Sequence, residues 1–229
     1  MKRLGYLILV ILLAAGCSRS KDVRLQSGDL IFVGIPQDYN LDRDSMADAI
    51  GDATGNGSLN LIHVAIAEVQ GDSVWIIDAT IKHGVDRHPL DTFLTDFTFK
   101  DGSYPVFIVK RLKDNSKAAQ FAENTKRFLG RPYDLWFLPD NEAMYCSELV
   151  RESYRPSDDY LFENKPMNFR NSEGEFPIYW QQLFARLGEP IPQDAPGTNP
   201  QDMSASPLLR DAAVNLLTYS TLPENKSAK

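Results

Sequence analysis

Cysteine is scarce in this sequence, which has only Cys17 and Cys146 among its 229 residues. If Cys17 carries lipid, no intramolecular disulfide can form and Cys146 is left as a lone thiol. A leftover cysteine in an exported protein raises the question of whether it is reactive. It could equally be an inert buried thiol, because free cysteine packs like a small hydrophobic residue.

Basic residues are also in short supply, since 24 Lys and Arg stand against 31 Asp and Glu and the formal charge is −7. Proteins bind nucleic acids largely through Lys and Arg that neutralise phosphates, so the composition argues against a nucleic-acid partner. Hydrophobic residues make up 43% of the chain, which is enough for a real core. The length fits one domain.

The apolar run at the N-terminus extends only from Gly5 to Ala15, well short of the roughly 20 residues that a transmembrane helix needs. The basic residues Lys2 and Arg3 precede it, and polar residues follow soon after it. A basic start, a short apolar core and small residues before a cleavage point are typical of an export signal.

Two small residues, Ala15 and Gly16, stand directly before Cys17. This arrangement resembles the lipobox of bacterial lipoproteins, in which the signal is cut before a cysteine that then carries acyl chains. We therefore predict a signal peptide over residues 1–16 and lipidation of Cys17, which would anchor the protein to a membrane of the bacterial cell envelope. The alternative is an ordinary signal peptide with a chance cysteine.

The remaining chain is predicted to form a tether, one folded domain and a flexible tail, at residues 17–26, 27–220 and 221–229. Short apolar runs predict strands, and helical spacing that stops at glycine predicts helices. Strands are predicted at residues 28–34, 63–69, 73–79 and 104–111, helices at 45–50, 89–96, 115–129, 144–154, 176–187 and 208–219, and irregular structure at 189–208. Since strands come first and helices follow, the pattern indicates an α+β fold, an antiparallel sheet packed on helices.

His63 and Asp78 interrupt the two apolar strands of a predicted hairpin. If the two-residue loop is Gln70-Gly71, these residues lie directly opposite each other, with Cβ atoms about 4.5–5.5 Å apart. If the loop is Gly71-Asp72, they lie on a diagonal, about 7–8 Å apart. In either register the carboxylate could fix the imidazole tautomer and stabilise its protonated form. The alternative is a buried pair that only ties two strands together.

Cys146 stands where a polar loop turns into a predicted amphipathic helix. The first turn of a helix presents the positive end of the backbone dipole, which favours a thiolate over a thiol. An imidazole close to such a sulfur would make it an ion-pair nucleophile, and the N–H of Cys146 would point to where an acyl oxyanion develops. Taken alone, a cysteine before a helix more often serves packing.

Several blocks of the sequence together resemble a known family, and those around His63 and Cys146 are the most specific. The blocks are Gly28-Asp29-Leu30-Ile31-Phe32, Ile62-His63-Val64-Ala65-Ile66, Ile77-Asp78-Ala79, Gly84-Val85, Pro89 to Leu94, Gly130 to Asp134 and Tyr145 to Val150. Over roughly residues 27–155 the chain is similar to the YiiX/YebB-like branch of the NlpC-type cysteine peptidase superfamily. This resemblance implies a circularly permuted papain-like fold, in which the His-bearing strands precede the Cys-bearing helix.

The resemblance also implies residue roles: Cys146 as the nucleophile, His63 as the base, and Asp78, where many members have Glu, as the group that orients the base. It implies a cysteine hydrolase, an amidase or peptidase that works by acyl transfer on cell-wall peptides or lipid-linked acyl groups. The rival hypothesis is a lipoprotein that binds a peptide or lipid in the same cleft without turnover.

Four aromatic residues surround the Cys146 segment. Tyr133, which the resemblance places near the nucleophile, is predicted to line a substrate groove with Tyr145 and Trp136. Phe137 is predicted to belong to the core instead.

The other two histidines, His83 and His88, have Asp86 between them. Their spacing matches no standard zinc pattern, so we predict solvated histidines in a loop. We expect no metal and no other cofactor.

Overall fold

The structure is a computed structural model that describes residues 23–37, 39, 45–55 and 58–219. The predicted signal peptide, Cys17 and the predicted tail lie outside the described residues. Within the predicted tether, Leu25 is only 4% exposed and its N–H donates to the Tyr219 hydroxyl at 2.6 Å.

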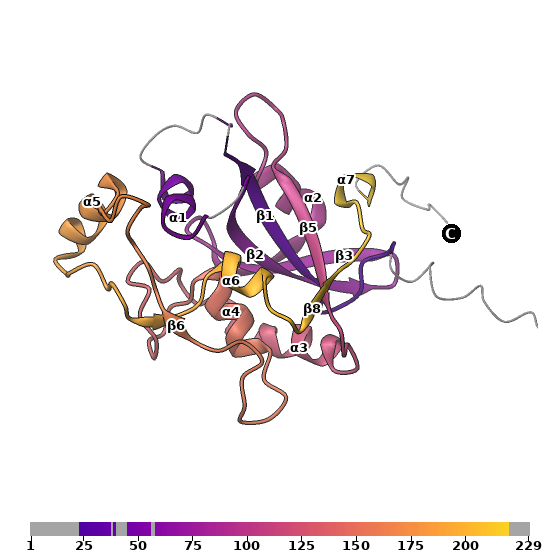
Figure 1. Ribbon diagram of the computed structural model, residues 1–229. Helices are drawn as coiled ribbons and strands as arrows, with labels where there is room; N and C mark the ends of the chain where they lie inside the picture. Colours follow the sequence, from indigo (N-terminus) through magenta and orange to yellow (C-terminus); the bar gives the residue numbers. More distant parts are fainter. Residues whose placement is uncertain (1–22, 38, 40–44, 56–57, 220–229) are drawn as a thin grey trace, which may run out of the picture.

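A six-stranded antiparallel sheet forms the centre of the molecule (Figure 1). Its strands are β1 (Leu30–Pro36), β2 (Leu59–Gln70), β3 (Ser73–Thr80), β4 (Gly84–Pro89), β5 (Val106–Leu112) and β8 (Leu209–Asp211). They lie in the order β4-β3-β2-β1-β5-β8. The hairpin that carries His63 and Asp78 is therefore continued by a third neighbouring strand, β4.

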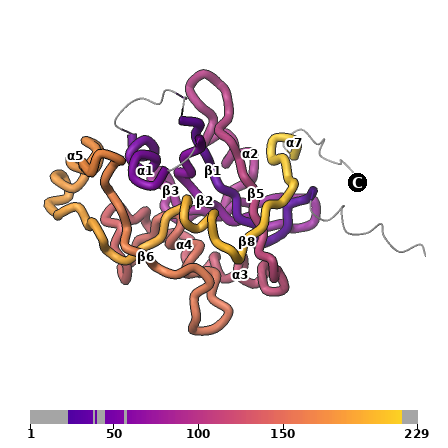
Figure 2. The backbone as a smooth tube through the Cα atoms, viewed as in Figure 1, coloured from indigo at the N-terminus to yellow at the C-terminus, as the bar shows by residue number. Residues whose placement is uncertain are grey.

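Both faces of this sheet are covered, which explains why β1 reads as a continuous apolar run. Leu30 and Phe32 pack on the face covered by helices α3 (Ala118–Thr125) and α4 (Cys146–Ser153). Ile31 and Val33 pack on the opposite face, under helix α2 (Leu90–Asp96). Figure 2 shows the chain on both sides of the strands. The predicted α+β architecture is confirmed.

The C-terminal third builds a second layer beside the sheet rather than a loose wrap. It contains β6 (Lys165–Pro166), α5 (Ile178–Leu187), β7 (Pro196–Gly197) and α6 (Pro200–Ser204). Helix α7 (Leu216–Tyr219) packs elsewhere, on the face of the sheet that α2 covers, through Leu216. Helix α5 ends at Gly188, which adopts the left-handed φ of 73° that glycine permits. Its buried Trp180 and Phe184 join Phe137 and Phe169 in a separate aromatic cluster, which also packs on helix α1 (Met46–Thr54).

Three segments differ from the sequence predictions. Residues 84–89, predicted as a loop, form the edge strand β4, which the pattern did not reveal because Asp86 and Arg87 break its apolar run. Residues 189–208 contain β7 and α6, so the prediction of irregular structure is wrong there. Residues 209–211, predicted as the start of a helix, pair with β5 instead, and three residues are too few for a period to show.

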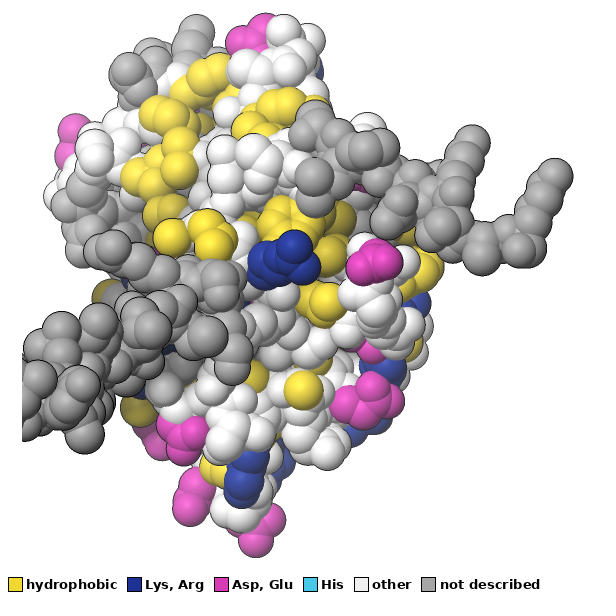
Figure 3. Space-filling model, turned by 90° about the vertical axis from the view of Figure 1, so that its right-hand side faces the viewer, with side chains coloured by type: hydrophobic (Ala, Val, Ile, Leu, Met, Phe, Trp, Pro, Cys, Tyr) yellow, Lys and Arg dark blue, Asp and Glu magenta, His cyan; other side chains and the backbone are white. Residues whose placement is uncertain are grey.

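Hydrophobic side chains are unevenly distributed over the face seen in Figure 3, on the side of α7 and β8. They gather in its upper half, whereas acidic and basic side chains are interspersed in its lower half. In the part of the chain that the structure describes, no helix has both the length and the apolar character needed to cross a membrane.

Candidate active site

Helix α4 begins at Cys146, because the preceding Tyr145 has an extended backbone and serves as the N-cap. Oε2 of Glu148 accepts a hydrogen bond from the Tyr145 N–H at 3.4 Å and so closes the first turn. Cys146 is a free thiol and is 4% exposed. Its sulfur therefore lies at the helix end where backbone N–H groups lack intrahelical partners.

Glu148 would place a second negative charge near the sulfur if it were ionised. Burial, together with the nearby charge of Asp134, raises the pKa of Glu148 to about 8. The side chain is therefore mostly protonated at neutral pH. Asp134 itself is buried and accepts hydrogen bonds from the N–H groups of Trp136 and Leu138, which shapes the loop before the helix.

The hairpin places His63 and Asp78 in the diagonal arrangement. Gln70 pairs with Ser73, so the loop is Gly71-Asp72, and Gly71 adopts the positive φ of 60° that such a turn requires at its first central position. The alternative register, with the loop at Gln70-Gly71, is wrong. His63 Nε2 and Asp78 Oδ2 nonetheless lie 2.7 Å apart, and both side chains are buried.

His63 also contacts the nucleophile candidate, because its ring forms a hydrogen bond with the side chain of Cys146. Burial by itself lowers the pKa of His63. The charge of Cys146, with the hydrogen bonds to Asp78 and Cys146, outweighs burial and raises this pKa to about 10. The imidazole is therefore protonated at neutral pH when the sulfur is ionised. Since Asp78 engages Nε2, Nδ1 is the ring nitrogen left for the sulfur.

Aromatic side chains of helix α2 and its C-cap cover the imidazole. The ring centroid of Phe97 lies 4.8 Å from that of His63, and the centroid of Phe93 lies 6.4 Å away. These contacts restrict rotation of the imidazole and shield its contact with Asp78 from water. The part of the site on the sheet, formed by His63 and Asp78, is thus both charged and shielded from water.

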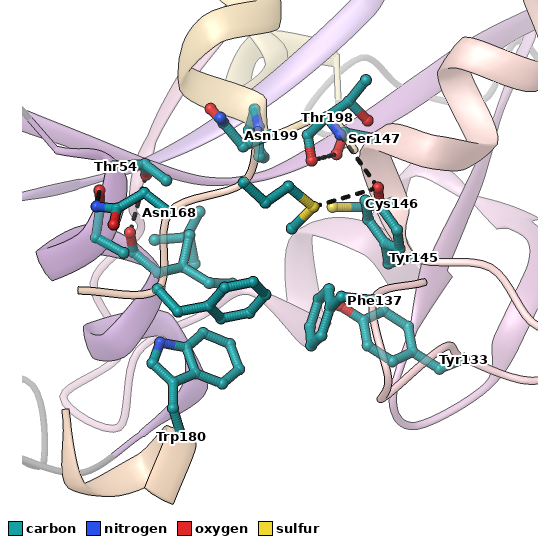
Figure 4. A pocket seen from close by; sticks show the side chains of 16 residues that line it. Thr54, Tyr133, Phe137, Tyr145, Cys146, Ser147, Asn168, Trp180, Thr198 and Asn199 are labelled. Carbon is teal, nitrogen blue, oxygen red and sulfur yellow. Dashed lines mark hydrogen bonds between the residues drawn. The ribbon is translucent and has the colours of Figure 1, made fainter. Parts of the chain in front are cut away.

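A pocket with an empty volume of about 420 Å³ opens beside Cys146 (Figure 4). Its lining is predominantly apolar and comes from α1, β2, the loop before α4 and the C-terminal layer. The lining residues are Ile50, Ala53, Thr54, Ile62, Tyr133, Phe137, Tyr145, Cys146, Ser147, Met167, Asn168, Phe169, Trp180, Thr198, Asn199 and Pro200. An apolar cleft beside a thiol is typical of a small-molecule or acyl-group site.

Hydrogen bonds tie the far wall of the pocket to helix α4. The Tyr145 hydroxyl accepts from the Thr198 N–H at 3.1 Å and contacts Met167 Sδ at 3.7 Å (Figure 4). The Ser147 hydroxyl donates to the Thr198 carbonyl at 3.0 Å. The residues on either side of Cys146 therefore hold the C-terminal layer in place.

The aromatic residues predicted to bind substrate fall into two groups. Tyr133 and Tyr145 line the pocket, whereas Trp136 is 40% exposed and is absent from the lining. Phe137 is buried, as predicted, but it also lines the pocket. Its backbone adopts a φ of 53°, so this residue turns inward. The sequence reasoning missed Phe169 and Trp180, which no local pattern connects with Cys146.

The prediction of solvated histidines in a loop is wrong for His88. This residue lies on β4, is 7% exposed and stacks on Phe93. It became buried because β4 joins the sheet beside β3, under helix α2. Among the described residues, no group of three or more His, Cys, Asp or Glu side chains is arranged to hold a metal ion.

An antiparallel sheet whose histidine-bearing strands precede a helix that begins with cysteine defines a papain-like cysteine hydrolase fold in permuted order. The chain belongs to the YaeF/YiiX family of permuted papain-like amidases, the C92 family, whose model matches residues 24–211. The resemblance inferred from the sequence is confirmed. The match also extends past residue 155, so most of the C-terminal layer belongs to the family fold.

Two relatives illustrate the match. The uncharacterized protein YiiX of Escherichia coli (strain K12) is 24% identical over 191 residues, which cover 82% of this chain and 86% of the relative. A crystal structure described as that of the metalloprotein yiiX from Escherichia coli O157:H7 superimposes with a TM-score of 0.61 at 24% identity. It covers 81% of this chain and 95% of the solved one, and it supports the fold.

Proposed function

We propose that the protein is an envelope-anchored cysteine hydrolase in which Cys146 is the nucleophile, His63 the base and Asp78 the group that orients the base. The observation that carries the proposal is the continuous contact from Cys146 through His63 to Asp78, beside a predominantly apolar pocket. Burying these three ionisable side chains together costs free energy, and such buried groups cluster at functional sites.

The reaction would proceed by acyl transfer. The ionised sulfur of Cys146 attacks the carbonyl carbon, and the N–H of Cys146 donates to the developing oxyanion. His63 then gives its proton to the leaving nitrogen or oxygen, the scissile bond breaks and a thioester remains. A water molecule loses a proton to His63 and attacks the thioester, which releases the carboxylic acid and restores the thiolate.

The pocket favours an apolar acyl group as the part of the substrate that becomes attached to sulfur. Its walls include Ile62, Phe169 and Trp180, and its lining is predominantly apolar. Cell-wall peptides are largely polar and would leave such walls without matching contacts. We therefore propose a lipid-linked amide or ester as the substrate, in preference to a cell-wall peptide.

Mass spectrometry of reaction products tests this function. Detergent-solubilised mature protein is incubated in parallel with an N-lauroyl amino acid, p-nitrophenyl laurate and a muropeptide. We expect release of lauric acid by the wild type and none above background by Cys146→Ala. Cleavage of the muropeptide alone would contradict the proposed substrate. Identical profiles from the two proteins would favour the rival, a lipoprotein that binds without turnover.

The membrane anchor is a separate proposal that depends on the small residues before Cys17. We expect the full-length protein to sediment with membranes and Cys17→Ser to lose the lipid mass and appear in the soluble fraction. A Cys17→Ser variant that keeps both the mass and the membrane association would exclude this anchor.

A further inference from the structure

We infer that His88 is a positioning residue for His63 and that it acts by holding the second oxygen of Asp78. This inference rests on the proposed function, since it concerns how the base is kept in place. His88 is not among the residues that line the pocket and faces Asp78 instead, so its contribution would pass through the carboxylate.

Asp78 lies between two histidines on three neighbouring strands. In the β3–β4 register Asp78 pairs with Asp86, so His88 stands two residues further along β4, on the diagonal. His63 stands on the opposite diagonal on β2, because the β2–β3 register, continued from the Ile66–Ile77 pair, puts it level with Thr80. Diagonal neighbours of this kind are within reach when a side chain is long or aromatic. The sheet therefore offers the carboxylate one imidazole from each side.

Three buried polar atoms of Asp78 and His88 lack a hydrogen-bond partner among the residues that the structure describes. They are Asp78 Oδ1 and both ring nitrogens of His88. Asp78 is 1% exposed, so water does not readily replace a missing partner. A buried acceptor and a buried donor that both lack partners are a rare combination in folded proteins.

The acceptor and the donor lie close to each other. His88 Nε2 is 3.8 Å from Asp78 Oδ1, which is beyond hydrogen-bond length but needs a shift of only about 1 Å to become one. Hydrogen bonds at catalytic sites are often long without substrate and shorten when it binds. The geometry thus fits a contact that closes when substrate binds.

A donor on Oδ1 would restrict the carboxylate in a way that His63 alone cannot. A carboxylate held at one oxygen can still turn about its last side-chain bond, because that torsion is broad. Holding both oxygens fixes the plane of the carboxylate and, through Oδ2, the direction of the His63 ring. Phe93 supports the arrangement, since its ring centroid lies 6.4 Å from that of each histidine.

The surroundings of His88 define which variants are informative. Its ring faces Asp78 on β3, Asp86 on its own strand, with Nδ1 3.7 Å from Oδ2, and Phe93 on α2. His88→Gln keeps an N–H near the position of Nε2. His88→Asn is too short to reach Asp78 but stays polar, and His88→Phe keeps the ring and removes both nitrogens. His83→Phe is a matched control, because that histidine faces Asp96 at 3.5 Å instead.

The experiment measures the rate at which iodoacetamide alkylates Cys146, followed by mass spectrometry of the Cys146 peptide between pH 5.5 and 9.5. We expect His88→Phe and His88→Asn to slow alkylation about tenfold at pH 6, the scale of one hydrogen bond to a charged group. Near pH 9.5 the difference should shrink, because a thiol there ionises without help. His88→Gln and His83→Phe should stay within about twofold of the wild type at every pH.

Three other outcomes would overturn the inference. If His63→Ala slows alkylation at pH 6 but no His88 variant does, the inference fails and the proposed function stands. If His88→Gln is as slow as His88→Asn, the ring matters for packing and not for its donor. If His63→Ala alkylates like the wild type, the proposed function itself fails. Should His88→Phe not fold, the comparison of His88→Asn with His88→Gln decides.

Discussion

On the sheet side of the site, polar side chains from neighbouring strands contact one another, whereas on the pocket side aromatic rings pack edge to face. His63 and Asp78 lie 2.7 Å apart, while the ring centroids of Phe169 and Trp180 lie 5.2 Å apart at 83°. The two sides meet at the first turn of α4. In the proposed mechanism, chemistry and substrate selection are therefore carried by separate parts of the molecule, and each should be open to disturbance without the other.

The largest expected effect is on the sheet side. His63→Ala should lower kcat by roughly a thousandfold or more, because the sulfur loses both its counter-ion and its proton carrier. KM for a long-chain acyl substrate should change little, since the pocket is intact. Steady-state kinetics on p-nitrophenyl laurate measure both values, and His83→Ala serves as the control. A His63→Ala variant that keeps a tenth of wild-type kcat would show that the sheet side does not carry the chemistry.

The next effect concerns Glu148, where the two sides meet. Its pKa in the folded protein is about 8, above the ordinary 4.5, so the folded protein keeps a proton that the unfolded chain loses between these values. The stabilisation is complete below pH 4.5 and is lost as the pH rises through 8. Relative to Glu148→Gln, the free energy of unfolding of the wild type should fall by about 1 kcal/mol per pH unit over this window.

Urea unfolding at pH 5, 6.5 and 8 measures this difference, and the glutamine can still accept from the Tyr145 N–H. Parallel pH profiles for the two proteins would show that Glu148 is ionised in the folded state.

A smaller effect is expected on the pocket side. Trp180→Leu should raise KM for a lauroyl substrate about tenfold, the scale of losing part of one aromatic contact. It should leave kcat and the alkylation rate of Cys146 unchanged. Ile178→Ala, an exposed position on the same helix, is the control. A tenfold loss of kcat in Trp180→Leu would show that the pocket wall also positions Cys146 and His63.

The smallest effect is expected for Trp136, which the sequence suggested as a substrate contact. Because it is exposed and absent from the pocket lining, Trp136→Ala should change stability by less than about 0.5 kcal/mol and KM by less than about twofold. Thermal unfolding and kinetics on the lauroyl substrate check this. A tenfold rise in KM would mean that the loop closes over the substrate.

The sheet side was largely predictable because its signals are local. Polar His63 and Asp78 stand out within apolar strands, and the hairpin limits them to two registers. The choice between those registers depended on the turn, where Gly71 supplies the positive φ. Burial of His88 was not predictable, since it depends on β4 joining the sheet, and the two consecutive charged residues Asp86 and Arg87 hide the strand pattern.

The pocket side was hardly predictable at all. Phe169 and Trp180 look like ordinary core residues of their own segments, and they reach the neighbourhood of Cys146 through ring contacts with Phe137, which in turn contacts Tyr145. Such contacts join residues far apart in the chain, so no period or motif marks them. Trp136 and Phe137 show the same limit, because the φ of 53° at Phe137 decides which of the two rings points inward.

Trapping the acyl-enzyme tests the central claim most directly. Mature protein is mixed with p-nitrophenyl laurate, quenched in acid within seconds and digested for peptide mass spectrometry. We predict a lauroyl mass on the peptide that contains Cys146 and no such mass in Cys146→Ala. Hydrolysis of the ester by wild-type protein with no label on Cys146, or with equal hydrolysis by Cys146→Ala, would contradict the account.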